Sequence, residues 1–253
     1  MNNVLNVYKP LGMTTFQAIK RFKELNPDYK NIPIAYTGRL DPMAEGVLVF
    51  LAGKKRFEAK KFQKLNKEYI AKILFGFSTD SYDLLGIKKE KSRTKVTKKE
   101  VAEKLKKYEG ENKLSLPPYC SYKIDGKPMF HWARNGKLDN KEIPQKRMKV
   151  INLSFENFYY ISDKKLLRYI TDTINKVRGD FRQKKIIKNW KDILQPLEGT
   201  KFPIAQIRLK VSGGTYIRSI AENLGKEMDS EALLFNLKRT KVADFTFEEA
   251  IKF

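Results

Sequence analysis

The chain has 253 residues, 41% of them hydrophobic and 12% aromatic, which is enough to bury the core of one large domain or two small ones. Lysine and arginine total 52 against 29 acidic residues, a formal charge of +23. This excess favours a polyanionic partner, although a merely lysine-rich composition would give the same charge. One cysteine and one histidine exclude a disulfide framework and a Cys/His zinc site. Because no apolar run could act as a signal peptide or cross a membrane, a cytoplasmic protein is expected.

The first part of the chain has the pattern of an α/β domain. Residues 4–8 predict a short strand, which ends at the Lys-Pro-Leu-Gly segment 9–12. Thr14 or Thr15 can cap the helix that follows. One side of this helix carries the apolar residues Phe16, Ile19, Phe22 and Leu25. Next, the loop at residues 35–46 (AYTGRLDPMAEG) is rich in turn formers and leads into an apolar strand, which makes it a prime place for functional residues.

The middle of the chain continues with mixed elements. Residues 69–77 alternate as a half-buried strand, and Thr97 with Glu100 forms a capping-box pattern for a second helix. Residues 116–136 are first loop-like and then aromatic. Residues 150–161 predict another strand. The order of these elements again indicates an α/β architecture.

Between Asp163 and Pro203 the pattern changes to two successive amphipathic helices, which is typical of an insertion. This segment is basic, since residues 163–202 hold eleven lysines and arginines against five acids. Such charge usually marks a solvated face, and on this chain it is also a candidate to follow a phosphate backbone. The chain then returns to a strand at 206–211 and a helical segment within 215–224. A capping-box pattern of Thr246 with Glu249 closes the sequence.

The sharpest candidate for a reactive group is Asp41, in the segment Gly-Arg-Leu-Asp-Pro at 38–42. With no metal or cofactor motif present, a side chain must carry the chemistry. An aspartate before proline is most often a turn former, because its carboxylate bonds to nearby backbone amides. The spacing alone does not raise Asp41 above that interpretation, but five other segments of the chain do.

Six segments resemble, in order, the motifs of the TruB family of pseudouridine synthases, and together they cover roughly residues 4–160 and 204–251. With the family pattern in parentheses, they are NVYKPLGMTT (KPxGxTS), AYTGRLDPMAEGVLV (GHTGTLDPxAxGxL), EYIAKILFGFSTDSYDLLG (KxYxxxxxLGxxTDTxDxxG), PPYCSYKIDGKPMFHWARNG (PPxxSAxKxxGxxxYxxARxG), VSGGTYIRSIAENLG (CSKGTYIRTLxxDLG) and FNLKRTKVADF (LxRTxxGxF). The resemblance implies the pseudouridine synthase fold. That fold is an α/β (α+β) domain with a central mixed, largely antiparallel sheet flanked by helices, here with a helical insertion and an RNA cleft across the sheet.

The resemblance also implies catalytic roles. Asp41 matches the aspartate that activates the flipped uridine, so that the base leaves its bond to nitrogen, rotates and rejoins the sugar through carbon. Tyr69 matches the tyrosine that stacks on the target base and assists proton removal. Arg218 matches the arginine that pairs with the aspartate and holds it ionised. No metal and no cofactor are expected.

Further residues are expected to bind substrate. Leu237 matches an apolar residue that lines the uridine pocket, although plain core packing would explain it equally well. The other candidates follow from their places in the matched motifs: Lys9, Tyr36, Arg39, Lys123 and Arg134. Lys123 stands one position away from the lysine of the family pattern. The implied substrate is tRNA, modified in the T arm at position 55 by a protein expected to act as a monomer.

Two departures from the family pattern keep alternatives open. Tyr36 replaces the usual histidine, and its ring is expected to fill the vacated space by stacking. Arg39 gives a GRLD form that is associated with pseudouridine synthases acting on ribosomal or other RNA. A ribosomal RNA synthase therefore remains an alternative, as does a catalytically weak RNA-binding or tRNA-folding protein, which the joint presence of Asp41, Tyr69 and Arg218 disfavours.

The domain organisation follows from the same motifs. We expect one catalytic domain over residues 1–253, interrupted by the basic helical insertion at about 163–203. The chain ends soon after its last motif, so no C-terminal PUA domain of the kind that many relatives carry is expected. The insertion is then the candidate to bind RNA in place of that domain.

Overall fold

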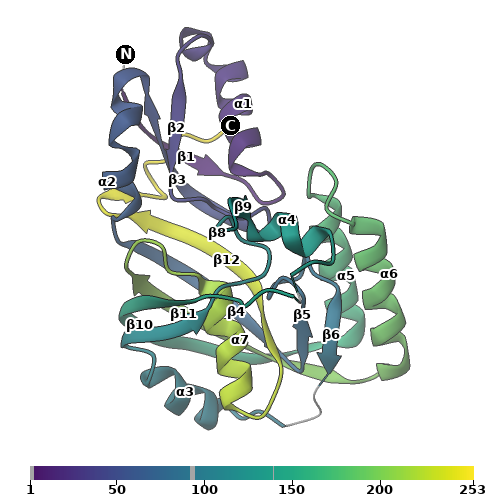
Figure 1. Ribbon diagram of the computed structural model, residues 1–253. Helices are drawn as coiled ribbons and strands as arrows, with labels where there is room; N and C mark the ends of the chain where they lie inside the picture. The colour runs from purple at the N-terminus through teal and green to yellow at the C-terminus, as the bar shows by residue number, and fades with distance from the viewer. Residues whose placement is uncertain (1–2, 92–94, 139) are drawn as a thin grey trace.

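The computed structural model describes residues 3–91, 95–138 and 140–253. Within these ranges a nine-stranded sheet forms the centre of the molecule (Figure 1), with the main order β1-β3-β12-β4-β11-β10-β7 and with β2 and β13 paired to β3 and β12. Its strands are β1 (Val4–Lys9), β2 (Ile34–Thr37), β3 (Ala44–Ala52), β4 (Lys67–Phe75), β7 (Gly110–Ser115), β10 (Gln145–Ser162), β11 (Lys201–Val211), β12 (Ala232–Val242) and β13 (Phe245–Thr246). The β12–β3 pairing is parallel and the other pairings of this sheet are antiparallel. The mixed, largely antiparallel sheet expected from the sequence is confirmed.

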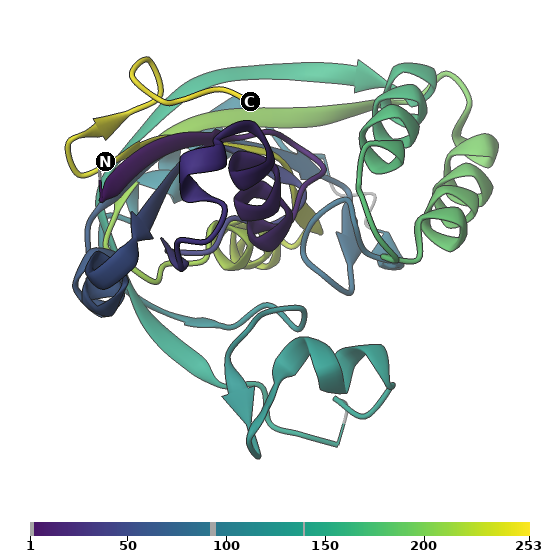
Figure 2. The same cartoon turned by 90° about the horizontal axis from the view of Figure 1, so that it is seen from above.

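Helices and short hairpins surround the sheet (Figures 1 and 2). The α-helices are α1 (Thr15–Leu25), α2 (Ala59–Gln63), α3 (Lys98–Lys106), α4 (Met129–Arg134), α5 (Asp163–Asn175), α6 (Gln183–Leu194) and α7 (Ile217–Glu227), and 3₁₀ turns lie at Pro27–Tyr29, Gly53–Glu58 and Gln195–Leu197. Two small hairpins pair β5 (Phe77–Thr79) with β6 (Lys88–Lys91), and β8 (Lys123–Ile124) with β9 (Lys127–Pro128). Figure 2 shows that the segment with β8, β9 and α4 stands away from the sheet. Phe130 and Arg134 of α4 face the β2–β3 loop, because α4 and this loop line one cavity.

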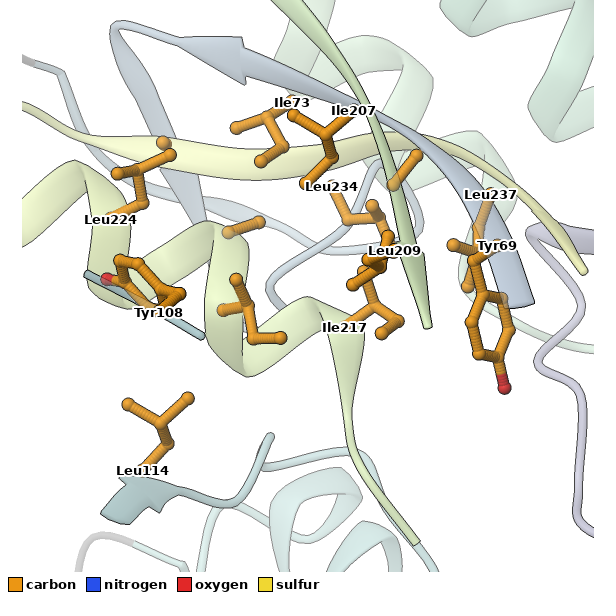
Figure 3. Packing of buried hydrophobic residues seen from close by; sticks show 14 of the residues in the cluster. Tyr69, Ile73, Tyr108, Leu114, Ile207, Leu209, Ile217, Leu224, Leu234 and Leu237 are labelled. Carbon is orange, nitrogen blue, oxygen red and sulfur yellow. The ribbon is translucent and has the colours of Figure 1, made fainter. Parts of the chain in front are cut away.

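The main core lies between α7 and the middle of the sheet. Ile217, Ile220 and Leu224 recur along one side of α7 and are buried against β4, β11 and β12 (Figure 3). This spacing is that of an amphipathic helix on a sheet. Burying such aliphatic side chains contributes about 1.5 to 3 kcal/mol each. The rigid α7 thereby fixes Arg218, which occupies its first turn.

The basic insertion forms α5 and α6, which pack together over the far end of the sheet (Figure 2). Trp190 of α6 is fully buried and its ring meets Phe77 edge-on, with 5.2 Å between ring centroids. Ile170 and Ile174 of α5 join the same cluster. The insertion is therefore anchored by its own apolar side, while its lysines lie on the solvent side.

The buried side of α1 differs from the expected one. Thr14 caps the helix with a capping box, and Phe22 is buried as expected. Phe16, however, is 74% exposed, and Leu25 is also exposed. Thr15 and Ala18 point inward in place of Phe16, because small side chains let the helix approach the sheet closely. The exposed Phe16 faces the region of the candidate site.

Two further expectations are corrected at the C-terminal end. The Thr246 hydroxyl does donate to Glu249, but a turn follows this pair and no helix starts there. The reason is that Ile251 forms a β-bridge with Val7 of β1, which requires an extended chain. The long strand β12 was not expected from the sequence. Its half-buried positions carry Asn236, Lys238, Thr240 and Lys241, and the charged Arg239 is buried between them, which interrupts the alternation of apolar and polar residues that marks a strand.

Candidate active site

Asp41 lies on the loop that joins β2 to β3, at an edge where several elements meet. Gly38 has φ +74°, a left-handed conformation that glycine adopts without strain, and it turns the chain out of β2. Arg239 of β12 is buried beneath the loop, where its guanidinium donates to the carbonyls of Gly38, Arg39 and Val47 at 3.2, 3.4 and 2.6 Å. A buried guanidinium thus links the start of the loop to β3.

The other side of the loop is held by the start of α1. The Thr15 hydroxyl accepts from the Leu40 amide at 3.3 Å and lies 3.2 Å from the Leu40 carbonyl. The amide of Gly12 donates to the Pro42 carbonyl at 2.8 Å. Leu40 itself is buried in the main core. The position of Asp41 is therefore set by contacts on both of its sequence neighbours.

Arg218 reaches Asp41 from the first turn of α7. Its Nη2 lies 2.9 Å from Oδ2 of Asp41, and its Nη1 and Nη2 donate to the carbonyls of Ser81 and Tyr119 at 2.8 and 3.1 Å. The Arg218 side chain is only 4% exposed, whereas that of Asp41 is 33% exposed. The guanidinium is thus a fixed, buried partner, and the carboxylate it orients stays open to a ligand.

Asp83 is a second carboxylate behind Arg218, and the sequence did not single it out. Its Oδ2 lies 3.8 Å from Nε of Arg218, which is too long for a hydrogen bond but close enough for an ion pair. Oδ1 accepts from the Ser81 hydroxyl and the Leu85 amide at 2.6 and 3.0 Å. Burial raises the pKa of Asp83, against the opposing effects of Arg218 and these hydrogen bonds.

The two carboxylates act together on the charge of Arg218. Burial alone would lower its pKa, but the nearby charges of Asp41 and Asp83 outweigh burial and raise the pKa above the ordinary value. Arg218 therefore stays charged at any ordinary pH. A permanent cation between two acids is a suitable device for orienting one of them.

A cavity of about 340 Å³ opens in front of Asp41 and Arg218. Tyr69 of β4 and Leu237 of β12 form part of its wall, together with Tyr36 and Arg39. Figure 3 shows the ring of Tyr69 beside Leu237, with the hydroxyl pointing away from the apolar cluster. The acid, the guanidinium and the aromatic ring thus meet in one cavity, which has room for a flat ring of nucleobase size.

A second cavity, also of about 340 Å³, shares a wall with the first. Both include Asp41, Tyr36, Arg39 and Tyr119 in their lining. Arg134 of α4 lines only the second cavity. The hydroxyl of Tyr36 accepts a hydrogen bond from Arg39 at 3.1 Å, so these two side chains are linked within the wall that the two cavities share.

Two residues expected to bind substrate lie outside both cavities, as far as the described residues show. Lys9 is fully buried and donates to the carbonyls of Pro10 and Met13, which holds the loop before α1. Burial lowers its pKa to about 7, partly offset by Asp41. Lys123 is exposed on the β8–β9 hairpin. Lys9 therefore acts on the site through the loop, and Lys123 belongs to the outer surface.

Lys67 was missed by the sequence interpretation, although it lines the first cavity beside Arg239. Its ammonium donates to the carbonyls of Gln63 and Leu65, and burial together with Arg239 lowers its pKa to about 8. The lining of this cavity therefore holds one carboxylate, that of Asp41, and four cationic side chains: Arg39, Lys67, Arg218 and Arg239. A cavity of this charge suits a ligand with phosphates around its reacting group.

The described part of the chain holds no group of three or more His, Cys, Asp or Glu residues that could bind a metal ion. In the same part, no helix has the length and apolar character needed to cross a membrane.

The fold resembles chains in several solved structures. A chain in the crystal structure of a Cbf5-Nop10-Gar1 complex aligns with a TM-score of 0.61 and 18% identity over 98% of this chain and 51% of that chain. A chain in the structure of an H/ACA RNP bound to a substrate RNA containing 2'-deoxyuridine aligns with a TM-score of 0.58 and 17% identity over 98% and 50%. This chain thus spans about half the length of those chains, and at such low identity the likeness concerns the fold. The likeness shows that this chain and those chains share one fold.

Sequence comparisons then identify the family. The model of the TruB family pseudouridylate synthase N-terminal domain matches residues 28–168, so this chain belongs to the TruB family. The tRNA pseudouridine synthase B of Fusobacterium nucleatum is 29% identical over 98% of this chain and 70% of its own length. The protein of the same name from Clostridium tetani is 29% identical over 99% of this chain and 71% of its own. The resemblance seen in the six motifs is confirmed.

Proposed function

We propose that this protein isomerises uridine to pseudouridine in the T arm of tRNA, at position 55. The observation that carries the proposal is the ion pair of Asp41 with Arg218, placed beside Tyr69 in one open cavity. Membership of the TruB family and similarity to proteins named tRNA pseudouridine synthase B support it. One chain carries all three side chains, so a monomer suffices, and we place it in the cytoplasm with its substrate.

The reaction needs a nucleotide that has left its stack. Extrusion costs a few kcal/mol, and an aromatic wall recovers part of this cost. In our proposal the flipped uridine enters the first cavity between Asp41 and Tyr69, with Leu237 against its ring. Tyr36 fills the space that the base vacates, in place of the family's histidine.

In the chemical step Asp41 acts on the flipped nucleotide while the permanent charge of Arg218 orients the carboxylate. The bond between N1 and C1′ breaks, the base rotates, and a bond from C5 to C1′ forms. C5 then loses its proton and N1 gains one, so the product is an isomer of the substrate. Tyr69 assists the removal of the proton from C5.

We further propose that the insertion at about 163–203 takes part in holding the RNA. Lys184, Lys188 and Lys191 lie exposed on one side of α6, at the spacing of a single helix face. Replacing all three with glutamine should weaken tRNA binding and lower the slope of log affinity against log salt by about one for each phosphate that is no longer neutralised. An unchanged affinity and slope would reject this role.

The activity is tested by incubating the purified protein, without added metal or cofactor, with an unmodified tRNA transcript and with a ribosomal RNA fragment. Pseudouridine is then mapped by chemical labelling and primer extension. We expect a single product in the T arm of the tRNA. A product only in the ribosomal RNA would establish the alternative that Arg39 suggests, and binding without any product would establish an RNA-binding protein.

A further inference from the structure

We propose that Arg182, on the loop between α5 and α6 (Figure 1), is a positioning residue for the reaction, and that it acts by fixing the two backbone carbonyls that orient Arg218. The proposal rests on the proposed function and deepens it. It joins the helical insertion to the active site, in addition to the part that the insertion takes in holding RNA.

The orientation of Arg218 depends on backbone carbonyls from two separate loops. Its Nη1 donates to the carbonyl of Ser81, in the loop between β5 and β6, at 2.8 Å. Its Nη2 donates to the carbonyl of Tyr119, in the loop before β8, at 3.1 Å, and the same nitrogen lies 2.9 Å from Oδ2 of Asp41. Nε of Arg218 is buried and has no hydrogen-bond partner among the described residues. A shift of either carbonyl therefore turns the guanidinium relative to Asp41.

Arg182 connects these two loops from the outside. Its Nη1 and Nη2 donate to Oδ2 and Oδ1 of Asp80, the residue directly before Ser81, at 2.9 and 3.4 Å. Its guanidinium also lies 4.7 Å from the centre of the Tyr119 ring, and the Tyr119 hydroxyl donates to Oδ2 of Asp80 at 3.3 Å. A pair with two hydrogen bonds fixes direction as well as distance. One side chain thus holds the neighbour of the first carbonyl and the residue that carries the second.

Asp80 passes this constraint on to its own loop. Its Oδ1 accepts from the Ile87 amide at 2.8 Å, and its own amide donates to the Ile87 carbonyl at 2.9 Å. A Cβ at Gly86 would lie 2.5 Å from the hydroxyl oxygen of Ser81 and 2.7 Å from Oδ1 of Asp80. The loop is therefore packed too closely for Asp80 to move without Ser81.

The backbone of Arg182 indicates that its side chain is needed at this position. Its φ of 64° lies in the left-handed region, which glycine adopts without strain and arginine adopts rarely. Such conformations persist where the surrounding structure imposes them, and they gather at functional sites. A glycine would suit this backbone, but it could not reach Asp80.

The loop that carries Arg182 is itself held in place. The amide of Arg178 donates to the Gly12 carbonyl at 2.9 Å, and the side chain of Gln17 donates to the Arg178 carbonyl at 3.3 Å. Gly12 has φ +93°, and a Cβ there would lie 2.2 Å from the carbonyl oxygen of Lys176. The loop before α1 and the insertion therefore touch with no room for a side chain between them, which gives Arg182 a fixed base.

A role in RNA binding alone does not account for this arrangement. Both Nη atoms of Arg182 are bonded to Asp80, and its side chain is only 32% exposed. In the described part of the chain, Arg182 lines neither cavity, so it acts on the substrate through other residues. We therefore expect Arg182 to affect the rate of the reaction more than the affinity for RNA.

The test measures single-turnover pseudouridine formation on an unmodified tRNA transcript for the wild type, Arg182→Gln, Asp80→Asn and the double variant. Saturating protein separates the rate from the affinity, which is measured on the same RNA. Arg208→Gln is the matched control. It also breaks a partly exposed ion pair, that of Arg208 with Glu156, and Arg208 lines neither cavity.

We expect Arg182→Gln and Asp80→Asn each to slow the reaction about tenfold, because small misplacements of catalytic groups are costly in rate. The double variant should be no slower than either single variant, since the two side chains act as one unit. Affinity for tRNA should fall a few fold at most, and Arg208→Gln should keep the wild-type rate. A wild-type rate in Arg182→Gln, losses that multiply in the double variant, or an equal loss in Arg208→Gln would overturn the proposal.

The NMR spectrum of the arginine side chains gives a readout that needs no turnover. The Arg218 signals are assigned by their loss in Arg218→Lys, which keeps a positive charge beside Asp83. Hydrogen bonds to two fixed carbonyls hinder rotation of the guanidinium, so its Nη protons should give sharp signals in the wild type and in Arg208→Gln. In Arg182→Gln these signals should shift or broaden, and an unchanged Arg218 spectrum would overturn the proposal.

The two proposals fail in different ways. A wild-type protein that forms no pseudouridine contradicts the proposed function, and the spectra still test whether Arg182 positions Arg218. An active wild type whose Arg182→Gln variant keeps its rate contradicts the positioning role alone.

Discussion

The floor of the first cavity and the outer wall of the second are built in different ways. The floor consists of charged groups, with the buried Arg218 between Asp41 and Asp83 and with the buried Arg239 under the β2–β3 loop. The wall is lined by the exposed ring of Phe16 and the half-buried rings of Tyr119, Phe130 and Phe181. Beside it, Arg182 of the loop between α5 and α6 forms a partly exposed ion pair with Asp80. Buried charges are rigid and costly to disturb, whereas exposed rings cost little to change. We therefore expect substitutions in the floor to have much larger effects than substitutions at the wall.

The largest effect is expected from Asp41→Asn. This change removes the carboxylate that we propose acts on the uridine but keeps the shape of the loop, so the rate of pseudouridine formation should fall by at least about a thousandfold. Single-turnover assays with saturating protein measure it. RNA affinity should stay close to that of the wild type, and a variant that retains full activity would remove Asp41 from the mechanism.

Arg218→Met should lower both activity and stability. It leaves Asp83 buried without its counter-ion, which costs about 3 to 5 kcal/mol in the free energy of unfolding. Urea denaturation measures the loss.

The double variant Arg218→Met with Asp83→Asn separates the two roles. Removing the orphaned charge should recover part of the stability, while activity should remain low because Asp41 still lacks its partner. If the double variant regains activity, Arg218 serves only to neutralise Asp83.

Lys9 should make stability depend on pH. Its pKa is lowered to about 7 in the folded protein, from the ordinary value of 10.5. Between these two values the unfolded chain binds more protons than the folded one, so stability should rise with pH by up to about 1.4 kcal/mol per pH unit. Below pH 7 Lys9 is protonated in both the folded and the unfolded state, so it adds no pH dependence to the free energy of unfolding.

Lys9→Met tests this dependence. The difference between the unfolding free energies of the wild type and this variant should change across pH 7 to 10 and stay level below pH 7. A difference that is constant over the whole range would show that the burial of Lys9 does not perturb its titration.

The smallest effect is expected at the wall. Arg182→Gln breaks the pair with Asp80, and because both side chains are partly exposed the loss of stability should be only about 0.5 to 1 kcal/mol. RNA affinity should fall a few fold, because the loop between α5 and α6 loses the contact that holds it. A stability loss as large as that of Arg218→Met would contradict the distinction between floor and wall.

The sequence predicted the floor better than the wall. Asp41, Tyr69 and Arg218 lie in recognisable motifs, and short-range patterns such as the Thr14 cap and the amphipathic α7 are visible in the chain order. Asp83 stood in a matched motif, but no local signal distinguishes an acid that will face a distant arginine. Lys67 and Arg239 were missed for the same reason, since their burial depends on strand pairing.

The wall could not be predicted because it depends on long-range packing. The spacing of Phe16 fits an apolar helix face, and only the close approach of Thr15 and Ala18 to the sheet leaves it outside. The insertion was expected from its helical pattern and its charge. Its contact with the loop before α1 joins Arg178 to Gly12, which lie far apart in the sequence. No local sequence pattern predicts such a contact.

The most direct test of the account is a crystal structure of the Asp41→Asn protein with a T-arm stem-loop. The account predicts that the target uridine is out of its stack in the first cavity, with its ring against Tyr69 and its C1′ facing the residue at position 41. A target uridine that remains stacked in the RNA, or that lies on a surface away from Arg218, would contradict it.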